Sequence, residues 1–387
     1  MYTRALKLPE MSFFLLGPRA TGKTTWLKRS LNDPPVHWVN LLLDSELARI
    51  ANNPAVFQQE VSALPADTWV VVDEVQRLPS LLNQVHHILT EHPGRYRFAL
   101  TGSSARKLRR KSTNMLAGRA LSLQFFPLTR SEMAKDFDLE AALQFGTLPL
   151  VVSAPNDMLR RQILKAYGET YLTQEIRAEA AVKSLESFSR FLQVAALMNG
   201  QAINTSNVAR DASVSRTTVQ GYFEILQDTL IGYFLPAFRP RKRVRESAHP
   251  KFYLFDTGVA RTLNGTLFNQ LTDMERGPLF ETWVCHELRA YLEYSQCGGE
   301  LAYWRTPNGV EVDFILSCGD SAIGIEVKSS ATWRAHSGDA LKELLRENVI
   351  QRAIGVYGGE HMIKDGPIEV YPAATWAAKL AEGAFVC

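Results

Sequence analysis

An apolar strand that runs into a loop framed by two glycines constrains the fold of this chain more than any other feature. Residues 12–16 read SFFLL, and the loop at 17–24 reads GPRATGKT, which fits the pattern GxxxxGK[ST] without a mismatch. Glycines at this spacing let backbone N–H groups fold around phosphate oxygens, and a helix that starts directly after the loop favours an anion at its N-terminus. The pattern therefore predicts a phosphate-binding site in an α/β fold.

The loop predicts ATP and Mg²⁺ as cofactors. Lys23 is expected to reach the β- and γ-phosphates, and the Thr24 hydroxyl is expected to ligate Mg²⁺. A bare glycine turn between strand and helix is the structural alternative. The predicted nucleotide contacts are Gly17, Pro18, Arg19, Ala20, Thr21, Gly22, Lys23, Thr24 and Thr25.

Two further apolar segments end in polar residues that suit the same site. Residues 68–74 read TWVVVDE, so Asp73 would hold Mg²⁺ through its water shell and Glu74 would polarise the attacking water. The strand predicted at 97–100 is followed by TGSS. Thr101 or Ser103 could sense the γ-phosphate there, although a hydroxyl in this place is as often a helix cap. Lys23, Glu74 and Thr101 are thus candidate catalytic residues.

The order of the predicted elements indicates the fold class. Apolar strands alternate with helical stretches, which is typical of a parallel sheet with crossover helices and a ligand site at the carboxyl ends of its strands. The five strands are predicted at 12–17, 37–43, 68–73, 97–101 and 120–126.

These motifs together resemble the AAA+ branch of P-loop ATPases. The block LAGRALSLQFFPLTRSE at 116–132 is similar to a prokaryotic ATPase family that joins this core to a C-terminal domain of unknown function. The likeness covers nearly the whole chain, because it continues through YGETYLTQEI, GPLFETWVCHEL and GVEVDFIL…IGIEVKSS. The loop at 146–152, GTLPLVV, departs from it, since relatives usually carry a second glycine and an acidic residue after the proline.

The resemblance also implies an assembly. In AAA+ proteins an arginine between the sensor strand and the fifth strand reaches the ATP of a neighbouring subunit, and Arg119 occupies that place. Arg119 is the candidate for this catalytic role, with a plain surface arginine as the alternative. A homo-oligomer is therefore expected, with a hexamer as the first choice.

The middle of the chain carries a pattern typical of DNA-binding proteins. Residues 204–226 predict a helix-turn-helix, with Ser215 as the N-cap of the second helix. A strand at 230–238, a basic run and a return strand at 251–256 complete a predicted winged helix, which in AAA+ chains also serves as a lid or protein contact. The candidate DNA contacts are Arg216, Thr217, Gln220, Arg239, Arg241, Lys242, Arg243 and Arg245.

The C-terminal segment resembles the D…ExK core of the PD-(D/E)xK nuclease fold. A helix is predicted to open at Glu281, and turn residues separate the strands that follow, which indicates an antiparallel meander. Alternation puts Glu326 and Lys328 on one face of their strand, and Asp313 on the adjacent strand can converge with them. A live site would hold Mg²⁺ between its carboxylates, with Glu281 as a possible extra carboxylate and Lys328 to orient or activate water. A retained fold without cleavage would keep Lys328 as the cation in a direct ion pair. A surface salt-bridge cluster of Lys328 with Glu326 or Asp313 is the other alternative.

Composition excludes several classes of protein. The chain has 387 residues and a formal net charge of +3, with 46% hydrophobic and 21% charged residues, so it is not a disordered chain, a coiled coil or a collagen-like repeat. The longest uncharged stretch, 191–209, contains Asn, Gln, Ser and Thr, so no membrane span is expected. Because the N-terminal apolar run is short and the four cysteines lack zinc spacing, we expect a cytoplasmic protein with reduced thiols.

The expected architecture is an AAA+ ATPase core at 1–150, a helical winged-helix domain at 151–265 and an α/β restriction-endonuclease-like domain at 266–387. This architecture favours an ATP-hydrolysing protein that acts on DNA as an oligomeric motor or remodeller. Branched or forked DNA is the expected substrate, because it would suit a motor joined to two DNA-type domains. One alternative is an ATP-controlled signalling or defence switch with a nuclease-like effector domain. Another is a protein-remodelling ATPase.

Overall fold

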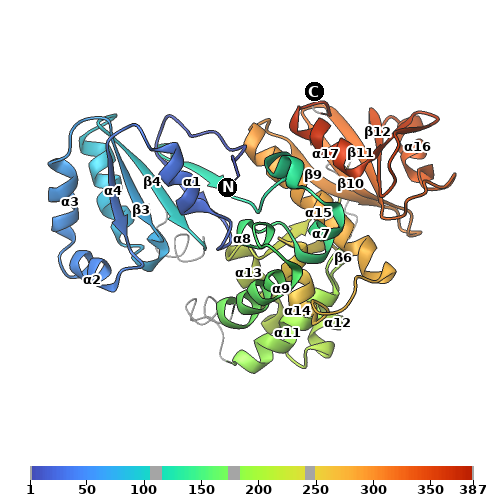
Figure 1. Cartoon of the computed structure of the whole chain (residues 1–387), viewed down its shortest axis with the longest axis horizontal. Helices are drawn as coiled ribbons and strands as arrows, with labels where there is room; N and C mark the ends of the chain where they lie inside the picture. The colour runs from blue at the N-terminus through green and yellow to red at the C-terminus, as the bar shows by residue number, and fades with distance from the viewer. Residues whose placement is uncertain (1, 105–115, 173–183, 240–248, 386–387) are drawn as a thin grey trace. The chain divides into compact units, whose positions relative to one another are not determined.

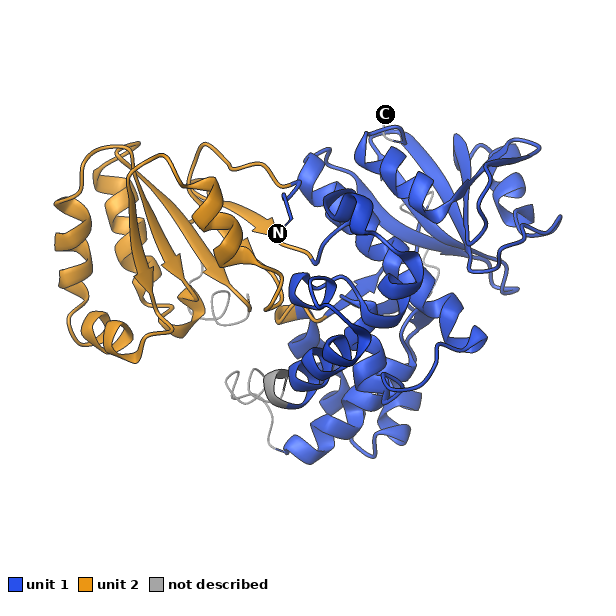
Figure 2. Ribbon diagram, viewed as in Figure 1, with its two compact units in different colours: residues 1–5, 127–227, 232–387 blue, residues 6–126, 228–231 orange. Residues whose placement is uncertain are grey.

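The computed structural model describes residues 2–104, 116–172, 184–239 and 249–385. The chain divides into two compact units, which Figure 2 shows in different colours. One unit comprises residues 6–126 and 228–231, and the other comprises residues 1–5, 127–227 and 232–387. The finer division at residues 150 and 265 stays a prediction.

The unit of residues 6–126 and 228–231 contains a five-stranded parallel sheet in the order β2-β3-β4-β1-β5, which confirms the predicted P-loop AAA+ type of core (Figure 1). All five predicted strands are present, with bounds that differ by a few residues. The elements are β1 (Phe13–Leu16), α1 (Lys23–Ser30), β2 (Val36–Asn40), α2 (Asp44–Asn52), α3 (Pro54–Ser62), β3 (Thr68–Asp73), η1 (Val75–Arg77), α4 (Leu81–Glu91), β4 (Tyr96–Gly102) and β5 (Leu121–Gln124).

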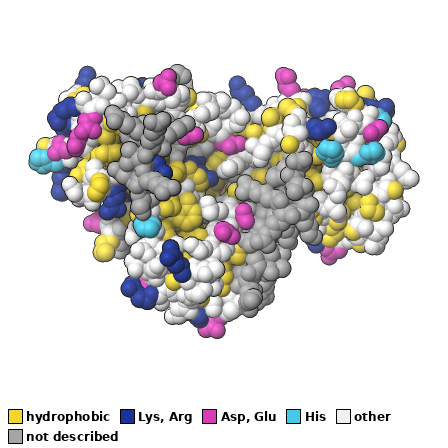
Figure 3. All heavy atoms as spheres, turned by 180° about the vertical axis from the view of Figure 1, so that it is seen from behind, with side chains coloured by type: hydrophobic (Ala, Val, Ile, Leu, Met, Phe, Trp, Pro, Cys, Tyr) yellow, Lys and Arg dark blue, Asp and Glu magenta, His cyan; other side chains and the backbone are white. Residues whose placement is uncertain are grey.

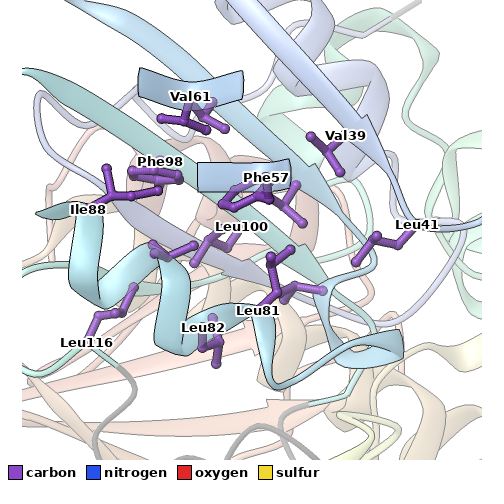
Figure 4. Close-up of a cluster of buried hydrophobic side chains, with 14 of the residues drawn as sticks. Val39, Leu41, Phe57, Val61, Leu81, Leu82, Ile88, Phe98, Leu100 and Leu116 are labelled. Atoms are coloured by element: carbon purple, nitrogen blue, oxygen red, sulfur yellow. The ribbon is translucent and has the colours of Figure 1, made fainter. Parts of the chain in front are cut away.

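Burial on both faces explains why these strands are continuous apolar runs. Successive residues of a strand point to opposite faces, so Phe13 packs edge-on against Trp26 of α1, while Phe14 joins the core on the other face. Figure 4 shows this second core, in which Ile88 of α4 packs with Phe98 and Leu100 of β4. Its other labelled residues are Val39, Leu41, Phe57, Val61, Leu81, Leu82 and Leu116.

A helical region of the second unit contains the two helices predicted within residues 204–226, whereas their role as the helix-turn-helix of a winged helix stays a prediction. These helices are α12 (Thr205–Asp211) and α13 (Arg216–Asp228), and the Thr218 N–H donates to the Ser215 hydroxyl at 3.1 Å, as expected for an N-cap. A small antiparallel sheet follows in the order β6-β8-β7. The other elements are α6 (Arg130–Met133), η2 (Ala134–Asp136), α7 (Leu139–Phe145), α8 (Pro149–Val152), α9 (Asp157–Ala166), η3 (Tyr167–Leu172), α11 (Leu185–Leu197), β6 (Gln201–Ala202), β7 (Gly232–Leu235), β8 (Lys251–Leu254) and α14 (Thr257–Asn264).

The loop at 146–152, where the chain departs from its expected relatives, is tied to α14. The buried carboxylate of Asp256 caps α14 by accepting the Val259 N–H at 3.0 Å, and it also accepts the Thr147 N–H at 2.8 Å. Burial raises the pKa of Asp256 to about 6. The contact gives this loop a structural role within its unit.

A six-stranded mixed sheet, in the order β13-β14-β12-β11-β10-β9, forms the C-terminal part of the same unit. Its β9-β10-β11 portion is the predicted antiparallel meander, whereas β12 pairs parallel with β11 and β14. The elements are α15 (Asp273–Ser295), β9 (Glu300–Arg305), β10 (Glu311–Cys318), β11 (Ser321–Lys328), α16 (Asp339–Arg346), β12 (Arg352–Tyr357), β13 (Ile363–Asp365), β14 (Ile368–Pro372) and α17 (Ala373–Ala381).

The prediction that a helix opens at Glu281 is wrong. Helix α15 begins at Asp273, and Thr272 and Glu275 form a capping box in which each side chain binds the other residue's backbone N–H. Pro278 lies inside this helix. Glu281 therefore sits well inside α15.

Candidate functional site

The loop at 17–24 has a backbone suited to an anion. Gly22, the N-cap of α1, has φ 92°, a left-handed conformation that favours glycine. Gly17 is also constrained, because a Cβ there would lie 2.2 Å from the backbone oxygen of Phe125. The loop thus leads into the N-terminus of α1, and the backbone N–H groups at a helix N-terminus attract phosphate.

Lys23 and Thr24 lie at the first turn of α1, with their polar atoms held by the surrounding loop. The Lys23 side chain is buried and its Nζ donates to the carbonyl oxygens of Gly17 at 2.7 Å and Pro18 at 3.0 Å. The Thr24 hydroxyl donates to the carboxylate of Asp73, at 3.0 Å from Oδ2. A hydroxyl beside a carboxylate is an oxygen pair of the kind that Mg²⁺ prefers, so these residues fit ATP with Mg²⁺.

Asp73 and Glu74 are both buried at the carboxyl end of β3 and are linked to the end of β4. Thr101 is fully buried, and its hydroxyl donates to Asp73 Oδ1 while it accepts the backbone N–H of Glu74 at 3.0 Å. Thr101 therefore contacts the two acidic residues directly, and a role for it as a phosphate sensor stays a prediction.

A glutamine that the sequence analysis did not single out contacts the proposed base. The Gln76 amide donates to Glu74 Oε2 and, at 2.9 Å, to the Ser103 hydroxyl. Ser103 was itself a candidate sensor, and its hydroxyl lies 3.4 Å from Glu74 Oε2. Gln76 follows Glu74 by two residues, but no sequence pattern shows that its side chain is buried against Glu74.

Arg119 is exposed and lies in a turn before β5, where its N–H donates to the Leu116 carbonyl at 2.8 Å. This is the place expected for an arginine that acts on a neighbouring subunit, and that role stays a prediction.

The candidate DNA contacts are only partly visible. Arg216, Thr217 and Gln220 are exposed on α13, and Arg216 Nε donates to the Thr205 hydroxyl at 3.2 Å. Arg239 is also exposed. The remaining candidates, Arg241, Lys242, Arg243 and Arg245, lie outside the described residues.

Figure 3 shows one face of the molecule, on which cationic and anionic side chains of the described residues are interspersed. On this face the described residues form no single basic area of the kind that binds a phosphate backbone. The densest cationic runs of the sequence, at 106–111 and 239–245, fall almost wholly outside the described residues. A basic DNA-binding surface is therefore supported by the sequence and not by the described part of the structure.

In the C-terminal sheet the predicted acidic residues converge. Phe314 pairs with Ile325 between β10 and β11, so the next pair along puts Asp313 opposite Glu326. The Asp313 carboxylate accepts the Val327 N–H at 2.8 Å, and Lys328 forms an ion pair with Glu326. Glu281 reaches the same cluster from α15, because its charge acts on both Asp313 and Glu326.

The cation nearest Asp313 is Lys251, which the sequence analysis missed. Lys251 begins β8, is buried, and places its Nζ 3.4 Å from Glu281 Oε2 and 3.7 Å from Asp313 Oδ1. It also forms an ion pair with Glu311 at the start of β10. The expected ion pair of Lys328 is present, with Glu326 as its partner, and Lys251 is an additional cation of the cluster.

Burial and mutual repulsion set the titration of this cluster. Burial and then the charge of Asp313 raise the pKa of Glu281 to about 7 and that of Glu326 to about 8. Burial opposes the charge of Lys251, but Glu281, Asp313 and Glu311 together outweigh it and raise the lysine pKa. Tyr253, whose hydroxyl donates to Glu281 at 3.1 Å, also has a raised pKa because of its burial and Glu281.

Among the residues that the structure describes, no three His, Cys, Asp or Glu side chains are grouped closely enough to hold a metal ion. The C-terminal cluster contains ion pairs in which Lys251 and Lys328 lie among the carboxylates. A nuclease-like role for Glu281, Asp313, Glu326 and Lys328 stays a prediction.

Comparison with protein families identifies the first part of the chain. Residues 10–134 match an AAA domain family (AAA_14), so this part is an AAA+-type ATPase domain. Residues 136–270 and 276–376 match two domains of unknown function, DUF8612 and DUF4143. The predicted AAA+ resemblance is confirmed, and the resemblance of the C-terminal part to nucleases stays a prediction.

Curated proteins from several organisms match most of this chain. An uncharacterized protein of Mycobacterium tuberculosis is 26% identical over 352 residues, which cover 90% of this chain and 76% of that protein. An uncharacterized protein of Haemophilus influenzae is 21% identical over 302 residues, covering 74% of this chain and 72% of that protein. One of Methanocaldococcus jannaschii is 20% identical over 351 residues, covering 80% and 73%.

Solved structures show a weaker likeness. The Aeropyrum pernix Orc1 protein in complex with DNA has a TM-score of 0.30 at 14% identity and covers 67% of this chain and 87% of that one. Thermotoga maritima RuvB has a TM-score of 0.28 at 14% identity, with 58% and 82% covered. Scores of this size carry no argument about function, so the family match remains the basis of the assignment.

Within the described ranges, no helix is both long and apolar enough to cross a membrane.

Proposed function

We propose that this chain hydrolyses ATP at the loop of residues 17–24 and uses that hydrolysis to act on DNA as a cytoplasmic homo-oligomer. The observation that carries the ATPase proposal is the placement of Lys23, Thr24, Asp73 and Glu74 at one end of the parallel sheet. ATP would supply the phosphoryl group and Mg²⁺ would neutralise its charge.

Each of these side chains has a role that its contacts support. Lys23 would exchange its two carbonyl acceptors for phosphate oxygens. Thr24 and Asp73, already in contact at 3.0 Å, would hold Mg²⁺ between hydroxyl and carboxylate. Glu74 would accept a proton from the attacking water, because it is the carboxylate next to this pair and is buried away from bulk solvent.

The DNA part of the proposal is supported by α13, which presents Arg216, Thr217 and Gln220 to solvent at the second helix of a helix-turn-helix. Branched or forked DNA is the proposed form, by analogy with motors that carry several DNA-type domains. The deciding experiment measures the ATPase rate alone and with single-stranded, duplex, forked and four-way DNA. Stimulation by branched forms would support the proposal.

The same experiment separates the alternatives. Slow turnover with ATP-dependent assembly would favour a signalling or defence switch with the C-terminal domain as effector. Turnover that ignores every form of DNA would favour a protein-remodelling ATPase.

Arg119→Ala is expected to bind ATP normally and hydrolyse it slowly, because the arginine would serve the site of a neighbouring subunit. Mixed with Glu74→Gln, it should regain activity, since some interfaces then combine an intact Glu74 with an intact Arg119. Random mixing in a ring predicts recovery of roughly a quarter of the wild-type rate. A mixture no more active than the average of the two variants would contradict an intersubunit site.

Arg216→Ala is expected to weaken binding to DNA of any sequence if the arginine contacts phosphate. Loss of one phosphate contact should lower the slope of log affinity against log salt by about one unit. The matched control is Arg346→Ala, which removes an exposed arginine at the end of α16 and should leave affinity and slope unchanged. An unchanged salt slope for Arg216→Ala would assign α13 to a protein contact or a structural role.

A further inference from the structure

Glu74 has an unusual backbone for a residue other than glycine. Its φ is 60° and its ψ is 48°, in the left-handed region that side chains with a Cβ rarely adopt. The N–H of Glu74 donates to the Thr101 hydroxyl at 3.0 Å, which helps to hold this conformation. A strained backbone at a proposed catalytic residue persists only where the surroundings fix it.

The side chain of Glu74 is held as firmly as its backbone. Gln76, on η1, donates from its amide nitrogen both to Glu74 Oε2 and to the Ser103 hydroxyl. Ser103 Oγ is itself 3.4 Å from the same Oε2. All three side chains are buried, with exposed fractions of 8% for Glu74, 6% for Gln76 and 2% for Ser103.

The side-chain amide of Gln76 lowers the stability of the fold through one of its atoms. Its Oε1 is buried and has no hydrogen-bond partner among the described residues. A leucine of similar volume would avoid this unsatisfied oxygen, because a buried polar atom without a partner lowers stability. Packing alone therefore does not explain a glutamine at this position, whereas donation to Glu74 does.

We propose that Gln76, assisted by Ser103, is the positioning residue of the ATPase site, and that it fixes the Glu74 carboxylate through Oε2 so that Oε1 is left for the attacking water. The inference rests on the proposed hydrolysis of ATP with Glu74 as the base. Gln76 acts through Glu74 and does not itself touch the nucleotide. A base that is fixed in one orientation spends less time in unproductive geometries, so it accelerates the chemical step and leaves nucleotide binding unchanged.

The test is Gln76→Leu, which keeps the volume of the side chain and removes its donor. The kcat for ATP should fall about 10- to 100-fold, because misplacement of a catalytic group typically costs this much. The KM, the affinity for a fluorescent ADP analogue and the thermal unfolding midpoint should stay near wild type. The control is Gln59→Leu, since Gln59 is exposed on α3 and far from this network in sequence.

Two further variants separate positioning from a merely structural role. In a Glu74→Gln background, Gln76→Leu should cause no additional loss, because the group that it positions is no longer a base. Gln76→Glu should be worse than Gln76→Leu, since it places a second carboxylate against Oε2, while Ser103→Ala should give a partial loss.

The possible results each decide the question. If Glu74→Gln is inactive and Gln76→Leu has wild-type kcat, this inference is wrong and the proposed function stands. Additive losses in the double variant, or a loss of nucleotide affinity together with the unfolding midpoint, would also overturn it in favour of a structural role. If Glu74→Gln retains the wild-type rate, the proposed function itself fails and this inference fails with it.

Discussion

Glu74→Gln is expected to bind ATP with wild-type affinity and to hydrolyse it about 1000-fold more slowly, as is typical when a general base is lost. The amide has nearly the same shape as the carboxylate and can still accept the hydrogen bond that Gln76 donates to Oε2. The site should therefore keep its structure and lose only its base. Turnover by radiolabelled phosphate release and binding by calorimetry measure the two effects separately.

Lys23→Ala is the companion variant, with the opposite pattern. It removes the buried ammonium that lies on the carbonyls of Gly17 and Pro18, so the loop loses its charge for the phosphates. Affinity for ATP should fall about 100-fold, which corresponds to the loss of one or two hydrogen bonds to a charged group. Glu91→Gln, at the exposed end of α4, is the control. Wild-type turnover by Glu74→Gln would show that another group acts as the base.

Local patterns predicted the ATPase core well because its elements are local. A strand that is buried on both faces reads as an apolar run, and the turn that follows it carries its own glycines and polar residues. Local sequence was therefore enough to recognise two of these strands, the one that ends at Asp73 and Glu74 and the one that ends at Thr101. Their contact through the Thr101 hydroxyl follows from the parallel pairing of β3 with β4.

The sequence analysis did not identify Gln76 or Lys251, for different physical reasons. Gln76 lies in a short 3₁₀ turn, where no periodicity tells a buried side chain from an exposed one. Lys251 opens an apolar strand, and a lysine at a strand end is ordinarily solvated. Its partners are 30 or more residues away on α15 and β10, so only the tertiary fold brings them together.

In the C-terminal meander, the alternation of side chains along a strand predicted which residues face each other, but it did not predict where the preceding helix begins. The convergence of Asp313 with Glu326 was predictable, because period-two alternation and a hairpin fix which residues face each other. The start of α15 was not predicted correctly, since the capping box of Thr272 and Glu275 was overlooked. The ion pair of Lys328 with Glu326 follows from the same alternation, because both residues lie on one face of β11.

Lys251→Met is expected to destabilise the unit that contains it by about 3 kcal/mol, the lower end of the range for removing one partner of a buried ion pair. The lower end applies because Glu281 and Glu311 retain 22% and 25% side-chain exposure. With the ammonium gone, Glu281, Glu311 and Asp313 face one another without their nearest cation. Chemical denaturation, followed at equilibrium, measures the loss.

The destabilisation should depend on pH with a definite sign. Burial and Asp313 already raise the pKa of Glu281 to about 7, above its ordinary value, so the folded protein holds this proton more tightly than the unfolded chain does. Stability from such a group falls as pH rises between the unfolded and the folded pKa. Removing Lys251 takes away a charge that lowers the pKa of Glu281, so that pKa should rise further and the deficit of the variant should be smaller at about pH 5.5 than at about pH 8.

Three comparisons decide whether Lys251 is the cation of this cluster. Arg305→Met is the control, because Arg305 lies 3.5 Å from Glu311 but is 45% exposed, and a surface pair contributes less than about 1 kcal/mol. Adding Asp313→Asn to Lys251→Met should restore part of the lost stability, since it removes one of the uncompensated charges. A Lys251→Met protein as stable as wild type at about pH 8 would show that the stability of the carboxylate cluster does not depend on Lys251.

Mn²⁺-dependent cleavage of branched DNA by the wild type, absent in Asp313→Asn, would show instead that a metal can replace the lysine and that the cluster is a working nuclease site.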